Sequence, residues 1–158
     1  MRNRLFLTST VVLVAVLAFT VIAWGADSNV GTWKLNLAKS TYSPGPAPKS
    51  GTLTIEAHDG GIQYTSHGEN AEGSPIYIEF TAKYDGTDNP VTGSPDFNSI
   101  ALKRIDAHTV ESTTKKDGTV MLSSRTVVSH DGKTRTLTSK GKNAAGQDVN
   151  NVVVYDKQ

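Results

Sequence analysis

The 158-residue sequence contains no cysteine, which excludes a disulfide framework, a cysteine nucleophile and a lipid-modified N-terminal cysteine. Aromatic residues make up only 7% of the chain, and its formal net charge is +1. Binding to nucleic acid needs a clustered basic surface, which so balanced a charge does not predict. We therefore expect a fold held by its hydrophobic core alone, and no nucleic-acid partner.

The single long hydrophobic run lies at the N-terminus. Two arginines precede an apolar segment of nineteen residues, 5–23, as is typical of a secretory signal helix. Ala23 and Gly25 supply the small residues needed for cleavage after Gly25, so we predict a signal peptide over 1–25 and a mature domain over 26–158. A retained membrane anchor is the alternative, because nineteen residues approach the length of a spanning helix. Both interpretations predict a periplasmic or secreted domain.

After residue 26 the sequence lacks a sustained apolar period of 3.6 residues, so helices of at most a turn or two are expected. Short runs of alternating apolar and polar residues predict β-strands instead. The nine predicted strands cover residues 30–36, 52–57, 61–67, 76–84, 99–105, 109–115, 120–129, 134–140 and 149–156.

Asp-Gly pairs separate several of these strands. They stand at Asp59-Gly60, Asp85-Gly86, Asp117-Gly118 and Asp131-Gly132. Both residues tolerate positive φ, so each pair favours a two-residue hairpin and consecutive strands are predicted to form a meander. Two connections are longer: a stiff, proline-rich connector over 43–48 and an irregular loop over 87–98.

An open meander of nine strands would expose two unpaired edges, and closure of the sheet removes both. We therefore predict an all-β fold, a single antiparallel up-and-down barrel of about 8–10 strands. A two-sheet sandwich is the alternative. Barrels of this size either fill themselves with side chains or enclose one small ligand, and that difference bears directly on function.

Four segments carry a resemblance to known proteins. Gly31-Thr32-Trp33-Lys34-Leu35 resembles the Gly-x-Trp opening of the calycins, the group that holds lipocalins and intracellular fatty-acid-binding proteins. Val152-Val153-Val154-Tyr155-Asp156 resembles the closing strand of the latter, and the body, over 82–93 and 101–106, resembles small exported bacterial lipocalin-like proteins without an assigned activity. The resemblance implies an up-and-down barrel that binds a small hydrophobic molecule.

The chain departs from the fatty-acid-binding proteins in two respects. In that family an inward arginine lies two residues before the closing tyrosine and holds the ligand carboxylate. Here Tyr155 keeps its place, but Val153 occupies the position of the arginine. The helix-turn-helix lid is also not expected, because the proline-rich connector cannot form it. The likeness therefore moves toward a lipocalin without a lid.

Alternation along the strands predicts which side chains face the barrel interior. Trp33 is expected to point inward and plug the barrel floor. Arg104 and Arg125 are candidates for a cation that replaces the missing arginine, although arginines at strand ends usually extend to solvent. The predicted ligand-binding residues are Tyr64, Ile78, Phe80, Leu102, Arg104, Arg125 and Tyr155.

The sequence shows no catalytic or metal-binding pattern. The four histidines match no metal motif, and no Gly-x-Ser-x-Gly nucleophile elbow occurs. We predict no catalytic residue, no metal and no cofactor, and expect a monomer that binds a small hydrophobic molecule without catalysis. Two alternatives stay open: a filled barrel that serves as a structural or interaction module of the cell envelope, and, less favoured, a small hydrolase or isomerase.

Overall fold

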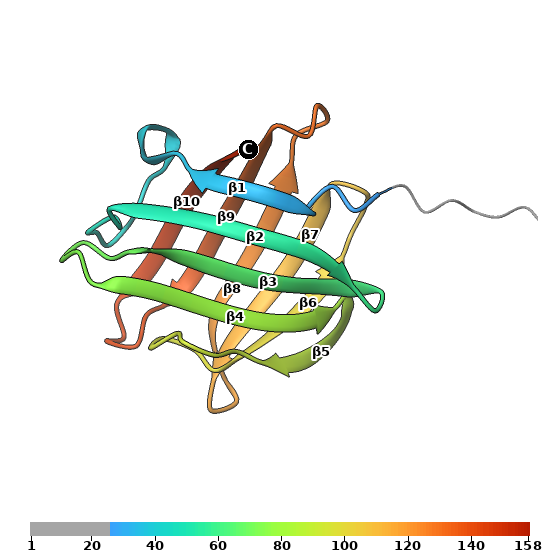
Figure 1. The fold of residues 1–158 in the computed structure, drawn as a ribbon. Coiled ribbons are helices and arrows are strands. Elements are labelled where there is room, and N and C mark those ends of the chain that lie inside the picture. The colour runs from blue at the N-terminus through green and yellow to red at the C-terminus, as the bar shows by residue number, and fades with distance from the viewer. Residues whose placement is uncertain (1–25) are drawn as a thin grey trace, which may run out of the picture.

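The computed structural model describes residues 26–158, so the predicted signal segment lies outside the described residues (Figure 1). It contains ten β-strands and one short 3-10 helix, η1 (Leu37–Lys39). The strands are β1 (Gly31–Leu35), β2 (Ser50–His58), β3 (Gly61–Glu69), β4 (Pro75–Lys83), β5 (Asp85–Pro90), β6 (Ser99–Arg104), β7 (Thr109–Lys116), β8 (Thr119–Val128), β9 (Thr134–Lys142) and β10 (Asp148–Lys157). No helix within residues 26–158 is both long enough and apolar enough to span a membrane.

The strands form one antiparallel sheet that curls into a nearly closed barrel (Figure 1). Strands adjacent in sequence pair with each other except β4 and β5, and β1 pairs with β10, so the two ends of the domain meet within the sheet. A single bridge between Glu79 and Thr92 joins the outer edges of the sheet. The predicted all-β meander barrel is confirmed, and the sandwich alternative is wrong.

The strand that the sequence analysis missed is β5. Asp85-Gly86 does not form the predicted hairpin turn; it begins β5, which pairs with β6 and not with β4. Residues 87–90, predicted as loop, complete this strand. All residues of β5 are polar, Gly or Pro, so it lacks the alternation that identifies a half-buried strand. Its position at a sheet edge explains why a proline is tolerated.

Two of the predicted hairpin turns adopt the geometry that Asp-Gly favours. Asp59 and Gly60 have φ of 42° and 78°, and Asp117 and Gly118 have φ of 49° and 81°. Positive φ at both central residues matches the twist of the flanking strands, so each turn fixes the register of its hairpin.

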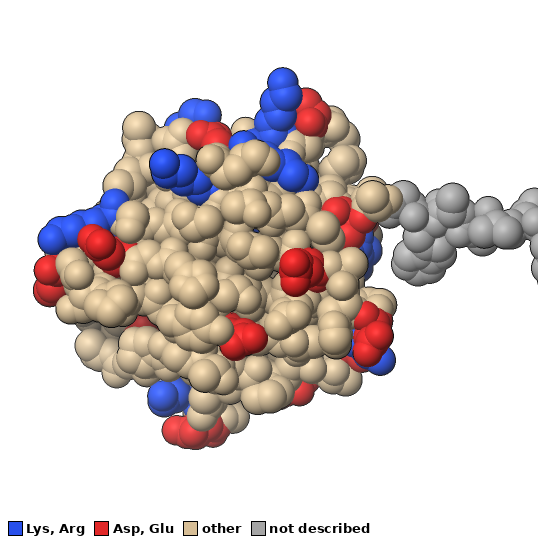
Figure 2. Space-filling model, in the orientation of Figure 1, with Lys and Arg blue, Asp and Glu red and all other residues tan. Residues whose placement is uncertain are grey.

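The hydrophobic core lies inside the barrel, and charged side chains lie mainly outside it. Trp33 and Leu53 are fully buried, and the indole Nε1 of Trp33 donates a hydrogen bond of 2.8 Å to the backbone oxygen of Asn29. Figure 2 shows basic and acidic side chains scattered over one face in both signs. A charged side chain in the interior is therefore the exception in this molecule.

Candidate ligand-binding site

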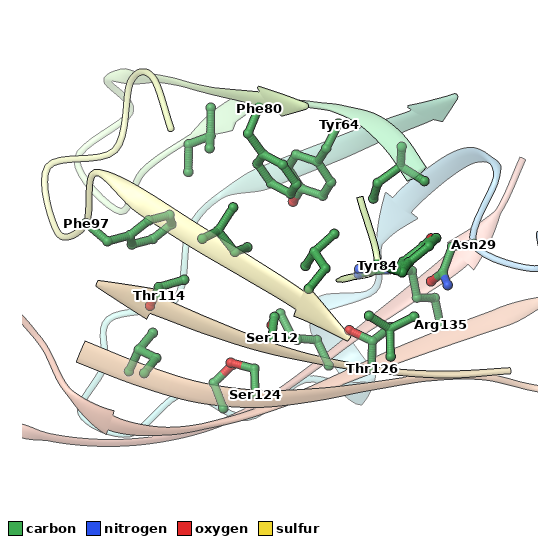
Figure 3. Close-up of a pocket in the computed structure, with 18 residues that line it drawn as sticks. Asn29, Tyr64, Phe80, Tyr84, Phe97, Ser112, Thr114, Ser124, Thr126 and Arg135 are labelled. Carbon is green, nitrogen blue, oxygen red and sulfur yellow. The ribbon is translucent and has the colours of Figure 1, made fainter. Parts of the chain in front are cut away.

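The barrel encloses a cavity of about 150 Å³ with two chemically different walls (Figure 3). Strands β3, β4 and β6 supply the apolar wall. Its residues are Ile62, Tyr64, Ile78, Phe80, Ile100 and Leu102. The rings of Tyr64 and Phe80 stack with their centroids 4.5 Å apart, so the two side chains pack against each other within this wall.

The opposite wall carries hydroxyl groups from β7, β8 and β9. Its polar residues are Ser112, Thr114, Ser124, Thr126 and Ser139. The hydroxyl of Ser124 donates to that of Ser139 over 2.8 Å, whereas the buried Oγ1 of Thr114 has no hydrogen-bond partner. A buried hydroxyl without a partner loses the hydrogen bonds it makes in water, so this wall retains unused hydrogen-bonding capacity.

Arg135 also lines the cavity, and within residues 26–158 it is the one charged residue that is buried, with 8% of its surface exposed. It extends from β9, where it lies in register with Val128 and Tyr155. Its Nε and Nη1 atoms are buried and have no hydrogen-bond partner. None of the ion pairs formed by the described residues includes it. The cavity thus contains a cation without an anion.

The N-terminal segment of the domain covers one end of the barrel. The Asp27 carboxylate accepts hydrogen bonds from the Tyr84 hydroxyl and from Nη2 of Arg104, each 2.5 Å long. Burial favours the neutral form of Asp27, but hydrogen bonds from Tyr84 and from the Asn29 N–H, together with the Arg104 charge, outweigh it and lower the pKa of Asp27 below its ordinary value. Burial and the bond to Asp27 raise the pKa of Tyr84. Asp27, Tyr84 and Arg104 thus satisfy one another at this end.

A groove of about 420 Å³ lies beside the other end of the cavity. The proline-rich connector lines one part of the groove with Pro44, Pro46 and Pro48. Phe97 and Leu122 line both the groove and the cavity. Figure 3 places Phe97 far from Asn29 and Arg135, so the groove adjoins the end of the cavity away from Arg135.

The structure brings together four of the seven residues predicted to bind ligand. Tyr64, Ile78, Phe80 and Leu102 all line the cavity. Tyr155 does not line it directly but lies next to it, with its ring centre 5.8 Å from the guanidinium carbon of Arg135. Burial raises the pKa of the Tyr155 hydroxyl, so this neighbour of Arg135 stays neutral.

The two arginines predicted to face the cavity do not offer a free cation there. Arg104 lies at the covered end, where Asp27 already neutralises its charge. Arg125 points outward: its Nη1 lies 3.2 Å from Glu111, and its side chain is 54% exposed. The expectation that Arg125 faces the cavity is wrong, because Ser124 and its alternate neighbours occupy the inward face of β8.

Sequence reasoning missed Arg135 and Asp27. The sequence did contain a signal for Arg135. Arg135, Leu137 and Ser139 lie on the same face of β9, and the apolar Leu137 identifies that face as the inward one. Asp27 had no local signal, because its partners Tyr84 and Arg104 lie 57 and 77 residues away in sequence.

The barrel is similar to a solved zebrafish ileal bile acid-binding protein, complexed with cholic acid. The match has a TM-score of 0.50, covers 83% of this chain and 99% of that chain, and has 12% sequence identity. The barrel has a calycin-like fold. No protein-family model and no curated protein matches the sequence. At so low an identity, the calycin-like likeness establishes the fold alone.

Proposed function

We propose that this protein is an exported, monomeric binding protein that holds a small hydrophobic molecule in its barrel without catalysis. The observation that carries the proposal is the mostly apolar cavity, which has a groove beside one end. Sites for small molecules are typically concave and apolar, with a few polar groups that fix the orientation of the ligand. The zebrafish protein with a similar barrel was solved with cholic acid, which supports the same use of the fold.

The chemistry of the lining favours binding over catalysis. Its polar side chains are hydroxyls, the Asn29 amide and the Arg135 guanidinium, and the lining includes no histidine or carboxylate. A nucleophilic serine needs an adjacent general base, and none of these groups supplies one. Among residues 26–158, no group of three or more His, Asp or Glu is arranged to hold a metal ion. The N-terminal sequence pattern supports export.

Binding of a neutral fluorescent probe tests the proposal. N-phenyl-1-naphthylamine added to delipidated protein is expected to bind with micromolar affinity and to gain fluorescence, with its phenyl ring in the cavity and its naphthyl group extending past Phe97 into the groove. Ile78→Trp should fill the cavity and abolish the signal, because Ile78 lines the apolar wall. The matched control is Val127→Trp, since Val127 is 41% exposed. It should bind as the wild type does.

Native mass spectrometry of the protein as purified provides a second test. A retained hydrophobic molecule would add its mass to that of a single chain, and would identify the ligand class. Absence of probe binding to the delipidated wild type, with no retained molecule, would overturn the proposal. A filled barrel that meets another envelope protein would then be the better account.

A further inference from the structure

Arg135 carries an inference about the ligand that rests on the proposed function. A charge inside a protein is costly unless a partner compensates it, with an effective penalty of several kcal/mol. Arginine keeps its charge in proteins, so Arg135 cannot avoid this cost by losing a proton. The described residues supply no anion, and its aromatic neighbour Tyr155 stays neutral. An anionic ligand in the cavity would supply the missing partner.

The shape of the guanidinium narrows the choice of anion. Its N–H donors form strong, charge-assisted hydrogen bonds with a carboxylate. Nε and Nη1 are both unbonded, and Arg135 is among the residues that line the cavity. An anion that reaches Arg135 must also carry an apolar body, since Tyr64, Phe80 and Leu137 surround the remaining space.

The size of the cavity narrows the choice of apolar body. An apolar cavity of roughly 150 Å³ accommodates a molecule the size of benzene. The enclosed volume here is about 150 Å³, so a single ring fits and a long acyl chain would extend past Phe97 into the open groove. The aromatic pair Tyr64 and Phe80 lines the space that such a ring would occupy, where aromatic contacts are favourable.

We propose that the cavity selects a compact aromatic carboxylate, whose carboxylate pairs with Arg135 and whose ring lies against the wall formed by Tyr64 and Phe80. The hydroxyl wall opposite serves polar substituents of the ring. Thr114, whose Oγ1 has no partner in the protein, is the first residue available for such a substituent.

Titration with trans-cinnamate, trans-cinnamamide and laurate tests this assignment. Wild-type protein is expected to bind cinnamate roughly 10- to 100-fold more tightly than cinnamamide, because the two differ in the charge that Arg135 recognises. The Hε resonance of Arg135 should shift with cinnamate and stay in place with cinnamamide. Laurate should bind no more tightly than cinnamate, because its chain leaves the enclosed volume.

Two arginine variants provide a matched pair for the same titration. Arg135→Gln should lose the 10- to 100-fold preference for the acid over the amide, at roughly the magnitude of a charged hydrogen bond. Arg125→Gln should keep the preference, because Arg125 lies on the outer surface beside Glu111. If Arg135→Gln does not fold, the preference for cinnamate over cinnamamide is measured on Arg135→Lys and on the wild type. These two measurements still test the carboxylate site.

Three outcomes would overturn the assignment. Equal affinity for cinnamate and cinnamamide, in a protein that binds N-phenyl-1-naphthylamine, would refute the carboxylate site and leave the proposed function standing. Laurate binding tenfold tighter than cinnamate would refute the compact ligand. Failure of all these probes to bind would refute the proposed function together with the inference.

Discussion

The two arginines inside the barrel, Arg104 at the covered end and Arg135 in the cavity, have opposite surroundings. Arg104 forms an ion pair of 2.5 Å with Asp27 and lies 4.1 Å above the ring of Tyr84. Arg135 is more deeply buried, yet two of its nitrogens have no partner. Within one small interior, the protein compensates one cation and leaves the other uncompensated.

This difference separates a polar group that holds the fold from one that is available to a ligand. At the covered end, segments far apart in sequence converge, and Trp33, Tyr84 and Arg104 each donate a hydrogen bond to Asn29 or Asp27. In the cavity, Thr114 as well as Arg135 retains unused donors. Buried polar groups in native proteins are normally satisfied, so each exception calls for an explanation.

Truncation of Trp33 should have the largest effect, because this fully buried ring packs at the covered end and its indole nitrogen is bonded to Asn29. Trp33→Ala is expected to lower the free energy of unfolding by about 3–5 kcal/mol. Chemical denaturation measures the change, and Val127→Ala on the outer face is the control. A loss below about 0.5 kcal/mol, the range of ordinary surface substitutions, would contradict the role assigned to this end.

Removal of the Asp27 charge should have the next largest effect. The folded-state pKa of Asp27 is lowered, so its ionised form stabilises the fold above roughly pH 4, the pKa of an unfolded aspartate. That contribution is lost as the pH falls through the lower folded-state pKa. Asp27→Asn should therefore cost about 1.5–3 kcal/mol at pH 7 and progressively less in acid. A constant difference across the pH range of a denaturation series would rule this explanation out.

Replacement of Arg135 should act in the opposite direction. Arg135→Met removes an uncompensated buried charge and keeps a side chain of similar length, so the ligand-free protein is expected to gain about 1 kcal/mol of stability. Thermal and chemical unfolding of delipidated protein measure it. Destabilisation by a similar amount would mean that Arg135 serves the fold, as Arg104 does.

Arg125 provides the smallest expected effect. Its ion pair with Glu111 is half-exposed on both sides, and such surface pairs contribute little. Arg125→Ala should change the free energy of unfolding by less than about 0.5 kcal/mol and leave cinnamate binding unaltered. A selective loss of cinnamate binding in this variant would contradict the outward position of Arg125, because it would mean that this residue contacts the ligand.

The sequence allowed the barrel to be predicted more completely than its site. Alternation and Asp-Gly turns are local signals, so they locate the hairpins of Asp59 and Asp117 directly. The same alternation fails for β5, whose side chains pack against little, and it left open which face of β8 points inward. The pairing of Asp27 with Arg104 depends on closure of the whole barrel, a long-range event that no local pattern contains.

The pairing of β1 with β10 determines when the chain is able to finish folding. Every other pairing in the sheet joins strands adjacent in sequence, through loops whose closure costs little entropy. A chain synthesised from the N-terminus is able to form these hairpins one after another. The strand of Trp33, β1, gains its second neighbour only when β10 is present. The sheet therefore closes onto β1 only after the final strand, β10, ten residues long, has been added. A chain that ends before β10 forms hairpins but does not close the barrel around a cavity.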